Sequence, residues 1–145
     1  MLADAARVGA IARAAYGKYV ERIGREPAPM VADFPAAITA GHVVVIESAG
    51  TVQGYMIGWP EPDAYFIDNI AVDPAHQGHG LGRQLIDHAL TEARRLRLMA
   101  IRLYTNVAMT ENLAMYHRFG FVETHRALER GFNRVYLRLS LQDEA

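Results

Sequence analysis

Three glycines occupy positions 78, 80 and 82 in the stretch NIAVDPAHQGHGLGRQLI, residues 69–86. They lie between an apolar run and a helical pattern, where glycine lets the backbone aim successive N–H groups into one concavity. A helix N-terminus adds partial positive charge, so the pattern predicts a phosphate-binding cradle. A turn that binds no ligand would use the same glycines. The spacing fits neither a P-loop, since no Lys-Ser/Thr pair follows, nor the dinucleotide-binding fingerprint.

A second candidate pair for chemistry is Asn112 and Tyr116, in the segment TENLAMYHRFGF at residues 110–121. Residues four apart lie on one face of a helix, so both side chains can approach the same ligand. A phenol with a pKa of about 10 can give a proton to a departing anion. On spacing alone, a partly buried tyrosine with a satisfied hydroxyl explains Tyr116 at least as well.

Periodicity predicts the elements that position these residues. Apolar residues at helical spacing indicate an amphipathic first helix, and the two prolines of GREPAPM make residues 24–30 a loop. Runs of β-branched and aromatic residues indicate a hairpin and then a third strand, which Asp73-Pro74 ends. Thr110 is expected to cap the last helix and Gly120 to end it. The expected helices are 8–23, 33–40, 81–96 and 110–120, and the expected strands 42–48, 51–59, 64–72, 99–106, 121–128 and 133–141.

Composition limits the classes of protein. The 145 residues are 51% hydrophobic, which predicts one domain, 1–145, with a real core. A formal charge of -1 gives no basic field for nucleic acid or for an anionic membrane. The chain has no cysteine, which excludes disulfides and thiolate nucleophiles and suits a reducing compartment. No stretch is long and apolar enough to span a bilayer, so a cytoplasmic protein is expected.

The stretch Gln77-Gly78-His79-Gly80-Leu81-Gly82 resembles the Q/R-x-x-G-x-G/A signature of the GNAT (Gcn5-related) acetyltransferases. TENLAMYHRFGF resembles the second motif of that family, and the order of elements is similar along nearly the whole chain. The resemblance implies an α/β fold whose mixed, mostly antiparallel sheet is flanked by helices. The family's first edge strand is missing here, because the chain opens with MLADAARV directly into a helix, or else the start codon is misassigned. A missing strand would expose the edge of HVVVIES, which a strand-paired homodimer or a loop would cover.

The resemblance also implies the cosubstrate and its contacts. In this family the cradle holds the pyrophosphate of acetyl coenzyme A, and the strand before it takes the pantetheine arm. Carried over to this chain, the Val72 N–H polarises the thioester carbonyl, Asn112 bonds to the arm, and Tyr116 protonates the departing thiolate. The residues expected to bind the cofactor are Ile70, Ala71, Val72, Gln77, Gly78, His79, Gly80, Gly82, Arg83, Asn112 and Tyr116.

The acceptor amine must lose a proton before it attacks, which calls for a base. Strand alternation places Asp68 on the face of Ile70 and Val72, and similar family members often carry an acid there. Glu26 and Glu61, in loops, are alternatives. His76 and His79 are three apart, but no third ligand has a suitable spacing, so no metal is expected.

These features predict an N-acetyltransferase in which an amine attacks acetyl-CoA directly in a ternary complex, since no cysteine is available for a covalent intermediate. The alternative is a non-catalytic module that binds or senses acyl-CoA; retention of Tyr116 and Asn112 disfavours it. The acceptor is expected to be an amine of a small molecule or a peptide. Its pocket is expected to draw on Tyr19, Arg25, Glu26, Met30, Trp59, Tyr104 and Asn106.

Overall fold

The computed structural model describes residues 4–24, 33–48, 50–78 and 80–141. The chain divides into two compact units: unit 1 is Met1–Gly58 with Asp68–Ile86, and unit 2 is Trp59–Ile67 with Asp87–Ala145. The N-terminal helices are α1 (Ala5–Tyr16), the 3-10 helix η2 (Gly17–Tyr19), α2 (Val20–Ile23) and α3 (Phe34–Thr39). The 3-10 helix η4 (Pro74–His76) and the helices α4 (Leu81–Arg95) and α5 (Thr110–Arg118) follow later in the chain.

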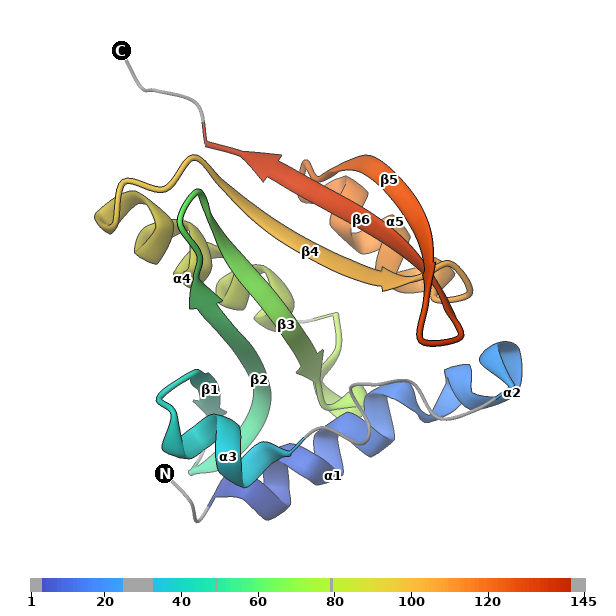
Figure 1. The fold of residues 1–145 in the computed structure, drawn as a ribbon. Helices are drawn as coiled ribbons and strands as arrows, with labels where there is room; N and C mark the ends of the chain where they lie inside the picture. Colours follow the sequence, from blue (N-terminus) through green and yellow to red (C-terminus); the bar gives the residue numbers. More distant parts are fainter. Residues whose placement is uncertain (1–3, 25–32, 49, 79, 142–145) are drawn as a thin grey trace. The chain divides into compact units, whose positions relative to one another are not determined.

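Six strands form one sheet in the order β1-β2-β3-β4-β6-β5 (Figure 1). Their bounds are β1 Val43–Ser48, β2 Thr51–Pro60, β3 Ala64–Val72, β4 Ala100–Asn106, β5 Val122–Glu129 and β6 Phe132–Ser140. The pairs β1–β2, β4–β6 and β5–β6 are antiparallel, while β3 pairs in parallel with β4. The expected mixed, mostly antiparallel sheet is therefore confirmed. Among the described residues no strand precedes α1, so β1 lies at one edge of the sheet.

In unit 1 the helix α1 buries one face. Val8, Ile11, Ala12 and Tyr16 recur at helical spacing and are all nearly inaccessible to solvent. Gly9 lies on the same face, next to the Phe34 ring of α3, which is 3.5 Å from the position that a Cβ would take.

The prediction of one continuous first helix is wrong. Residues 8–23 were expected to form one helix, but the 3-10 turn η2 interrupts the run after Tyr16. Gly17 begins this turn, and glycine is a poor helix former. The run ends as expected at Gly24, whose φ of 86° is left-handed. The rest of the predicted loop, residues 25–30, lies outside the described residues.

A smaller correction concerns α5. Thr110 was expected to be its N-cap, but the cap is Met109 and Thr110 is the first helical residue. The Thr110 hydroxyl donates to the neighbouring Glu111 carboxylate at 3.3 Å. Gly120, with a φ of 98°, follows the helix end as predicted.

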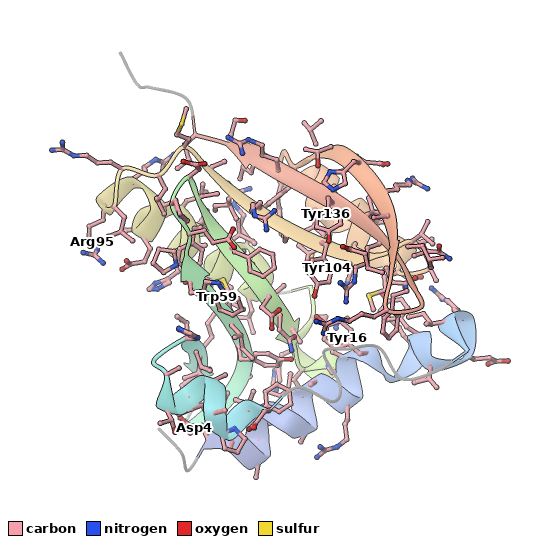
Figure 2. All side chains as sticks on the ribbon, viewed as in Figure 1. Asp4, Tyr16, Trp59, Arg95, Tyr104 and Tyr136 are labelled. Atoms are coloured by element: carbon pink, nitrogen blue, oxygen red, sulfur yellow. The ribbon has the colours of Figure 1, made fainter. Side chains whose placement is uncertain are left out.

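Unit 2 carries a row of aromatic rings across neighbouring strands. Trp59 on β2 packs on Phe66 of β3 at 5.3 Å between ring centroids, Phe66 on Tyr104 of β4 at 5.9 Å, and Tyr104 on Tyr136 of β6 at 5.5 Å. The row ends on β5, where His125 stacks on Tyr136 at 4.3 Å. Figure 2 labels Trp59, Tyr104 and Tyr136 along this row.

Candidate active site

The glycine-rich segment adopts the backbone that its composition predicts. Gly78 and Gly80 have φ angles of 84° and 78°, in the left-handed region that favours glycine. A Cβ added at either position would meet nothing within 4 Å, so both residues face open space. The Gly80 carbonyl accepts from the Gln84 amide at 3.1 Å, which joins the segment to the first turn of α4. This backbone can present N–H groups to an anion beside a helix N-terminus.

The other cradle residues are placed as follows. Gln77 is exposed before Gly78, Gly82 is half-buried in the first turn of α4, and Arg83 is exposed next to it. The Gln77 amide group donates to the Val72 carbonyl at 3.2 Å, so the cradle folds back onto the end of β3. His79 lies outside the described residues.

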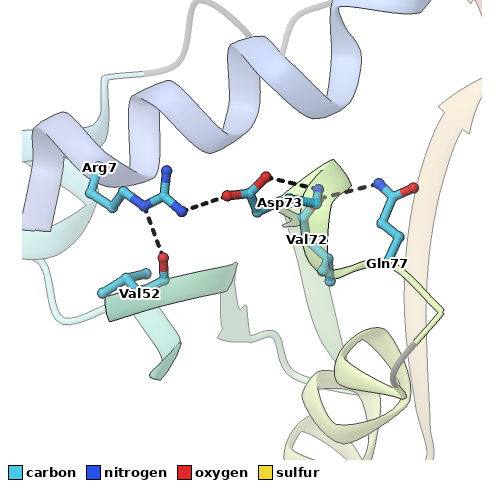
Figure 3. A network of polar contacts seen from close by, with 6 residues as sticks. Arg7, Val52, Val72, Asp73 and Gln77 are labelled. Atoms are coloured by element: carbon cyan, nitrogen blue, oxygen red, sulfur yellow. Dashed lines mark hydrogen bonds and ion pairs between the residues drawn. The ribbon is translucent and has the colours of Figure 1, made fainter. Parts of the chain in front are cut away.

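A polar network anchors the start of the cradle to α1 and β2 (Figure 3). The Arg7 guanidinium donates to the Asp73 carboxylate at 2.6 Å and to the Val52 carbonyl at 2.9 Å. The other Asp73 oxygen accepts from the Ala75 amide at 3.1 Å and so caps η4. The hydrogen bond from Arg7 holds the pKa of Asp73 below its usual value of 3.8, and the Ala75 amide lowers it further, against the opposing effect of burial.

The strand before the cradle is held by a buried hydroxyl. Tyr16, the last residue of α1 and 4% exposed, donates to the Ile70 carbonyl at 2.5 Å. Burial raises the pKa of Tyr16 well above its usual value of 10.0, and the negative charge of Asp68 raises it further. The Tyr16 hydroxyl therefore keeps its proton and remains a donor at physiological pH.

Unit 1 thus brings together most of the predicted site residues: Asp68, Ile70, Ala71, Val72, Gln77, Gly78, Gly80, Gly82 and Arg83. Asn112 and Tyr116 lie together on α5 in unit 2. Tyr116 is 3% exposed and its ring packs edge-on against Phe121 at 5.6 Å. The half-buried Asn112 amide contacts the Met109 sulfur at 3.8 Å.

Of the three candidate bases, Asp68, Glu61 and Glu26, the first two differ in their surroundings. The Glu61 carboxylate forms an ion pair with the Arg102 guanidinium at 2.7 Å, so another side chain already occupies it. Asp68 is half-buried, and its negative charge raises the pKa of the Tyr16 hydroxyl. Glu26 lies outside the described residues.

The predicted acceptor residues fall into different environments. Trp59 and Tyr104 belong to the aromatic row of unit 2, and the Arg134 guanidinium lies 4.2 Å from the centroid of the Tyr104 ring. Next to this row is a hollow of about 320 Å³ lined by Val107, Arg126, Ala127, Leu128, Asn133 and Arg134. Asn106 is buried and accepts from the Ala108 amide, which indicates a structural turn. Tyr19 is 1% exposed. Arg25, Glu26 and Met30 lie outside the described residues.

The described residues contain neither a metal-binding cluster nor a membrane-spanning helix. No three His, Cys, Asp or Glu side chains gather in a way that could hold a metal ion. No helix in this part of the chain has the length and apolar character needed to cross a membrane.

Tyr16 and Arg7 contact the site but were not predicted to do so from the sequence. Both lie on α1, yet they hold groups 54 and 66 residues away in the chain, at the end of β3 and the start of η4. The local signal, a tyrosine and an arginine on an amphipathic helix, is typical of many helices with no such role.

Several known proteins are similar to this chain in sequence or in structure. The model of the acetyltransferase (GNAT) family matches residues 10–121. The N-alpha-acetyltransferase RimI of Mycobacterium tuberculosis is 32% identical, over 94% of this chain and 87% of that protein. The structure of Ard1 from Thermoplasma volcanium has a TM-score of 0.77 at 21% identity, covering 99% of this chain and 95% of its own. A GNAT family acetyltransferase from Elizabethkingia anophelis, with acetyl-CoA bound, has a TM-score of 0.61 at 21% identity over 73% of this chain and 80% of its own.

Proposed function

Because the chain belongs to the acetyltransferase (GNAT) family, we propose that it transfers the acetyl group of acetyl-CoA to the α-amine of a peptide or protein in a ternary complex. One observation carries the cosubstrate assignment. Gly78 and Gly80 have a left-handed backbone that faces open space, between η4 at the end of β3 and the first turn of α4. That arrangement suits a pyrophosphate, which needs several N–H donors in one concavity.

The backbone amides of Gln77, Gly78, Gly80, Gly82 and Arg83 would bind the pyrophosphate, with His79 in the same segment. Ile70, Ala71 and Val72 would flank the thioester, and the Val72 N–H would stabilise the negative charge that develops on the carbonyl oxygen. Asn112 would bond to the pantetheine arm. These roles rest on the motif resemblance together with the local geometry of each segment.

The reaction needs one protein group that donates a proton and one that accepts a proton. The neutral amine attacks the carbonyl carbon of the thioester, forming the C–N bond, and the C–S bond then breaks. Tyr116 would protonate the departing thiolate, and Asp68, directly or through water, would take the proton that the amine loses. Asp68 is favoured over Glu61 because the Arg102 guanidinium already binds the Glu61 carboxylate.

The proposed acceptor follows from proton affinity as well as from the similarity to RimI. With a pKa of about 7.7 to 8.0, roughly one α-amine in ten is already neutral at pH ~7, against about one lysine side chain in 2,500. A site whose best candidate base is one half-buried aspartate is therefore better suited to an α-amine. Small-molecule amines remain the competing acceptors.

Thermal unfolding with acetyl-CoA, and with NAD and ATP as controls, tests the cosubstrate. Ligand at about one hundred times its dissociation constant adds roughly 2.7 kcal/mol, a shift on the order of 5 to 10 °C for a domain of this size. Release of free coenzyme A thiol then tests the acceptor, using peptides with a free N-terminus, the same peptides N-terminally blocked but carrying lysine, and single amino acids or polyamines. Equal shifts with all nucleotides would contradict the cosubstrate, and activity on the blocked peptides or small amines alone would contradict the α-amine.

A further inference from the structure

The end of β3 has two distinct edges. An added Cβ at Gly54 of β2 would lie 3.2 Å from the Ala71 carbonyl oxygen, and the Asp73 amide donates to the Gln53 carbonyl of β2 at 2.8 Å. The backbone of Ala71 and Asp73 therefore faces β2. In an extended strand the N–H and C=O of one residue point to the same edge and alternate along the chain. Ile70 and Val72 consequently direct their N–H and C=O groups to the opposite edge.

Side chains engage the two carbonyl groups on that opposite edge. The Tyr16 hydroxyl donates to the Ile70 carbonyl at 2.5 Å, and the Gln77 amide donates to the Val72 carbonyl at 3.2 Å. The first of these donors is buried and comes from the last residue of α1, whose other buried residues pack in the core of unit 1. Figure 2 labels Tyr16 at the carboxyl end of β3. The helix end therefore fixes where the Tyr16 hydroxyl stands.

This contact has an electrostatic consequence for the proposed reaction. The Ile70 carbonyl and the Val72 N–H share one edge, so a thioester oxygen that accepts from Val72 also lies near the negative end of the Ile70 carbonyl dipole. A hydroxyl donated to that carbonyl offsets part of its negative potential. It also restrains the plane of the peptide that joins Ile70 to Ala71, and this peptide is covalently next to the one that carries the Val72 N–H.

We propose that Tyr16 is a positioning residue for acetyl transfer: its hydroxyl, held on the Ile70 carbonyl, aims the Val72 N–H and shields the developing oxyanion from the neighbouring carbonyl. The inference rests on the proposed function, in which that N–H meets the thioester. In this proposal α1 affects the reaction through its contact with β3, and it contacts neither substrate. Such an effect grows with negative charge in the transition state, so it acts on kcat more than on affinity.

The chain offers a matched control in Tyr55. Tyr55 is also buried in unit 1, and its hydroxyl donates at 2.7 Å to the side chain of Asn69, the residue before Ile70. Tyr16→Phe and Tyr55→Phe each remove one buried hydroxyl. The first hydroxyl donates to Ile70 and the second to Asn69, which are adjacent residues of β3. Only Tyr16→Phe removes a donor from the backbone edge that carries the Val72 N–H.

The test measures three quantities for the wild type and both variants: the melting temperature, the dissociation constant for acetyl-CoA, and kcat for thiol release with the most active acceptor peptide. We expect both variants to lose a few degrees in melting temperature and to bind acetyl-CoA within about twofold of the wild type. We expect kcat to fall about 10- to 100-fold in Tyr16→Phe and to stay within about twofold in Tyr55→Phe. Equal kcat values in the two variants, or a loss in Tyr16→Phe that appears wholly in acetyl-CoA affinity, would overturn the proposal.

A third variant keeps the test decisive if Tyr16→Phe does not fold. Tyr16→4-aminophenylalanine retains a donor at the same ring position, so kcat is expected within about threefold of the wild type. A folded variant with this donor whose kcat falls tenfold or more would contradict the positioning role. If instead the wild type itself neither binds acetyl-CoA nor releases thiol, the proposed function fails first, and that outcome is visible before any variant is compared.

Discussion

Gly80→Ala tests the cradle most directly. Gly80 has a φ of 78°, and a Cβ there would meet no protein atom within 4 Å. An L-residue in this conformation costs roughly 1 to 2 kcal/mol, partly offset by roughly 0.4 to 1 kcal/mol because alanine also restricts the unfolded chain. The net loss of stability is therefore about 1 kcal/mol, or a fall of about 4 °C in melting temperature. The variant should fold.

The effect on ligand binding should be larger than the effect on stability. If the new methyl group keeps a phosphate oxygen from one backbone N–H, the loss is that of a hydrogen bond to a charged acceptor, about 1.5 to 3 kcal/mol. That corresponds to about 10- to 100-fold weaker binding of acetyl-CoA. Isothermal titration calorimetry with acetyl-CoA measures it.

Gly41→Ala supplies the control for this experiment. Gly41 follows α3 with a φ of 77°, and a Cβ there also meets nothing within 4 Å. The two substitutions therefore impose the same backbone strain in the same unit, and only Gly80 lies in the cradle. Gly41→Ala should lose the same few degrees and bind acetyl-CoA as the wild type does. If Gly80→Ala binds as tightly as Gly41→Ala, the glycines serve the turn and the phosphates bind elsewhere.

Tyr116→Phe should bind acetyl-CoA within twofold of the wild type yet lose at least tenfold in kcat near pH ~7, measured as thiol release; unchanged turnover would show that Tyr116 is not the acid. Asp73→Asn should lower the free energy of unfolding in urea by about 1 kcal/mol at pH ~7. The pKa of Asp73 is lower in the folded protein than in the unfolded chain, so its carboxylate stabilises the fold at pH values above the unfolded-state pKa. This contribution is lost as the pH falls through the folded-state pKa, so the difference in stability between variant and wild type should shrink below pH ~4. Equal costs at both ends of that pH range would contradict the ion pair. We also propose that the two units form one domain, so Trp59 fluorescence and far-UV circular dichroism should report coincident unfolding transitions, and separate midpoints would refute this.

Local patterns were enough to predict much of the fold. The third strand was predicted at 64–72 and is Ala64–Val72, because an apolar run marks its extent and Asp73-Pro74 marks its end. The family resemblance, carried mainly by the glycines and the element order, is confirmed by the match to the GNAT family model over residues 10–121. Signals of this kind depend on residues close together in the chain, which a sequence displays directly.

The wrong predictions of helix boundaries concern residues whose type is compatible with more than one position in or near a helix. Thr110 is a good N-cap by type, but its hydroxyl bonds to Glu111, and the helix begins one residue earlier than a threonine cap would require. Gly17 interrupts the first helix although the apolar spacing continues on both sides of it. Periodicity indicates which face of a helix is buried, but it does not show where backbone hydrogen bonds change from one helical type to another.

The role of α1 illustrates a different limit. A buried tyrosine hydroxyl must find a hydrogen-bond partner, so burial of Tyr16 alone predicts that it bonds to some backbone or polar group. Which group depends on a contact across 54 residues of sequence, and here it is the carbonyl two residues before Val72. Arg7, nine positions earlier on the same helix, binds Asp73 one residue after Val72. One helix therefore holds the strand on both sides of the proposed oxyanion donor, and substitutions on α1 should alter turnover without touching either substrate.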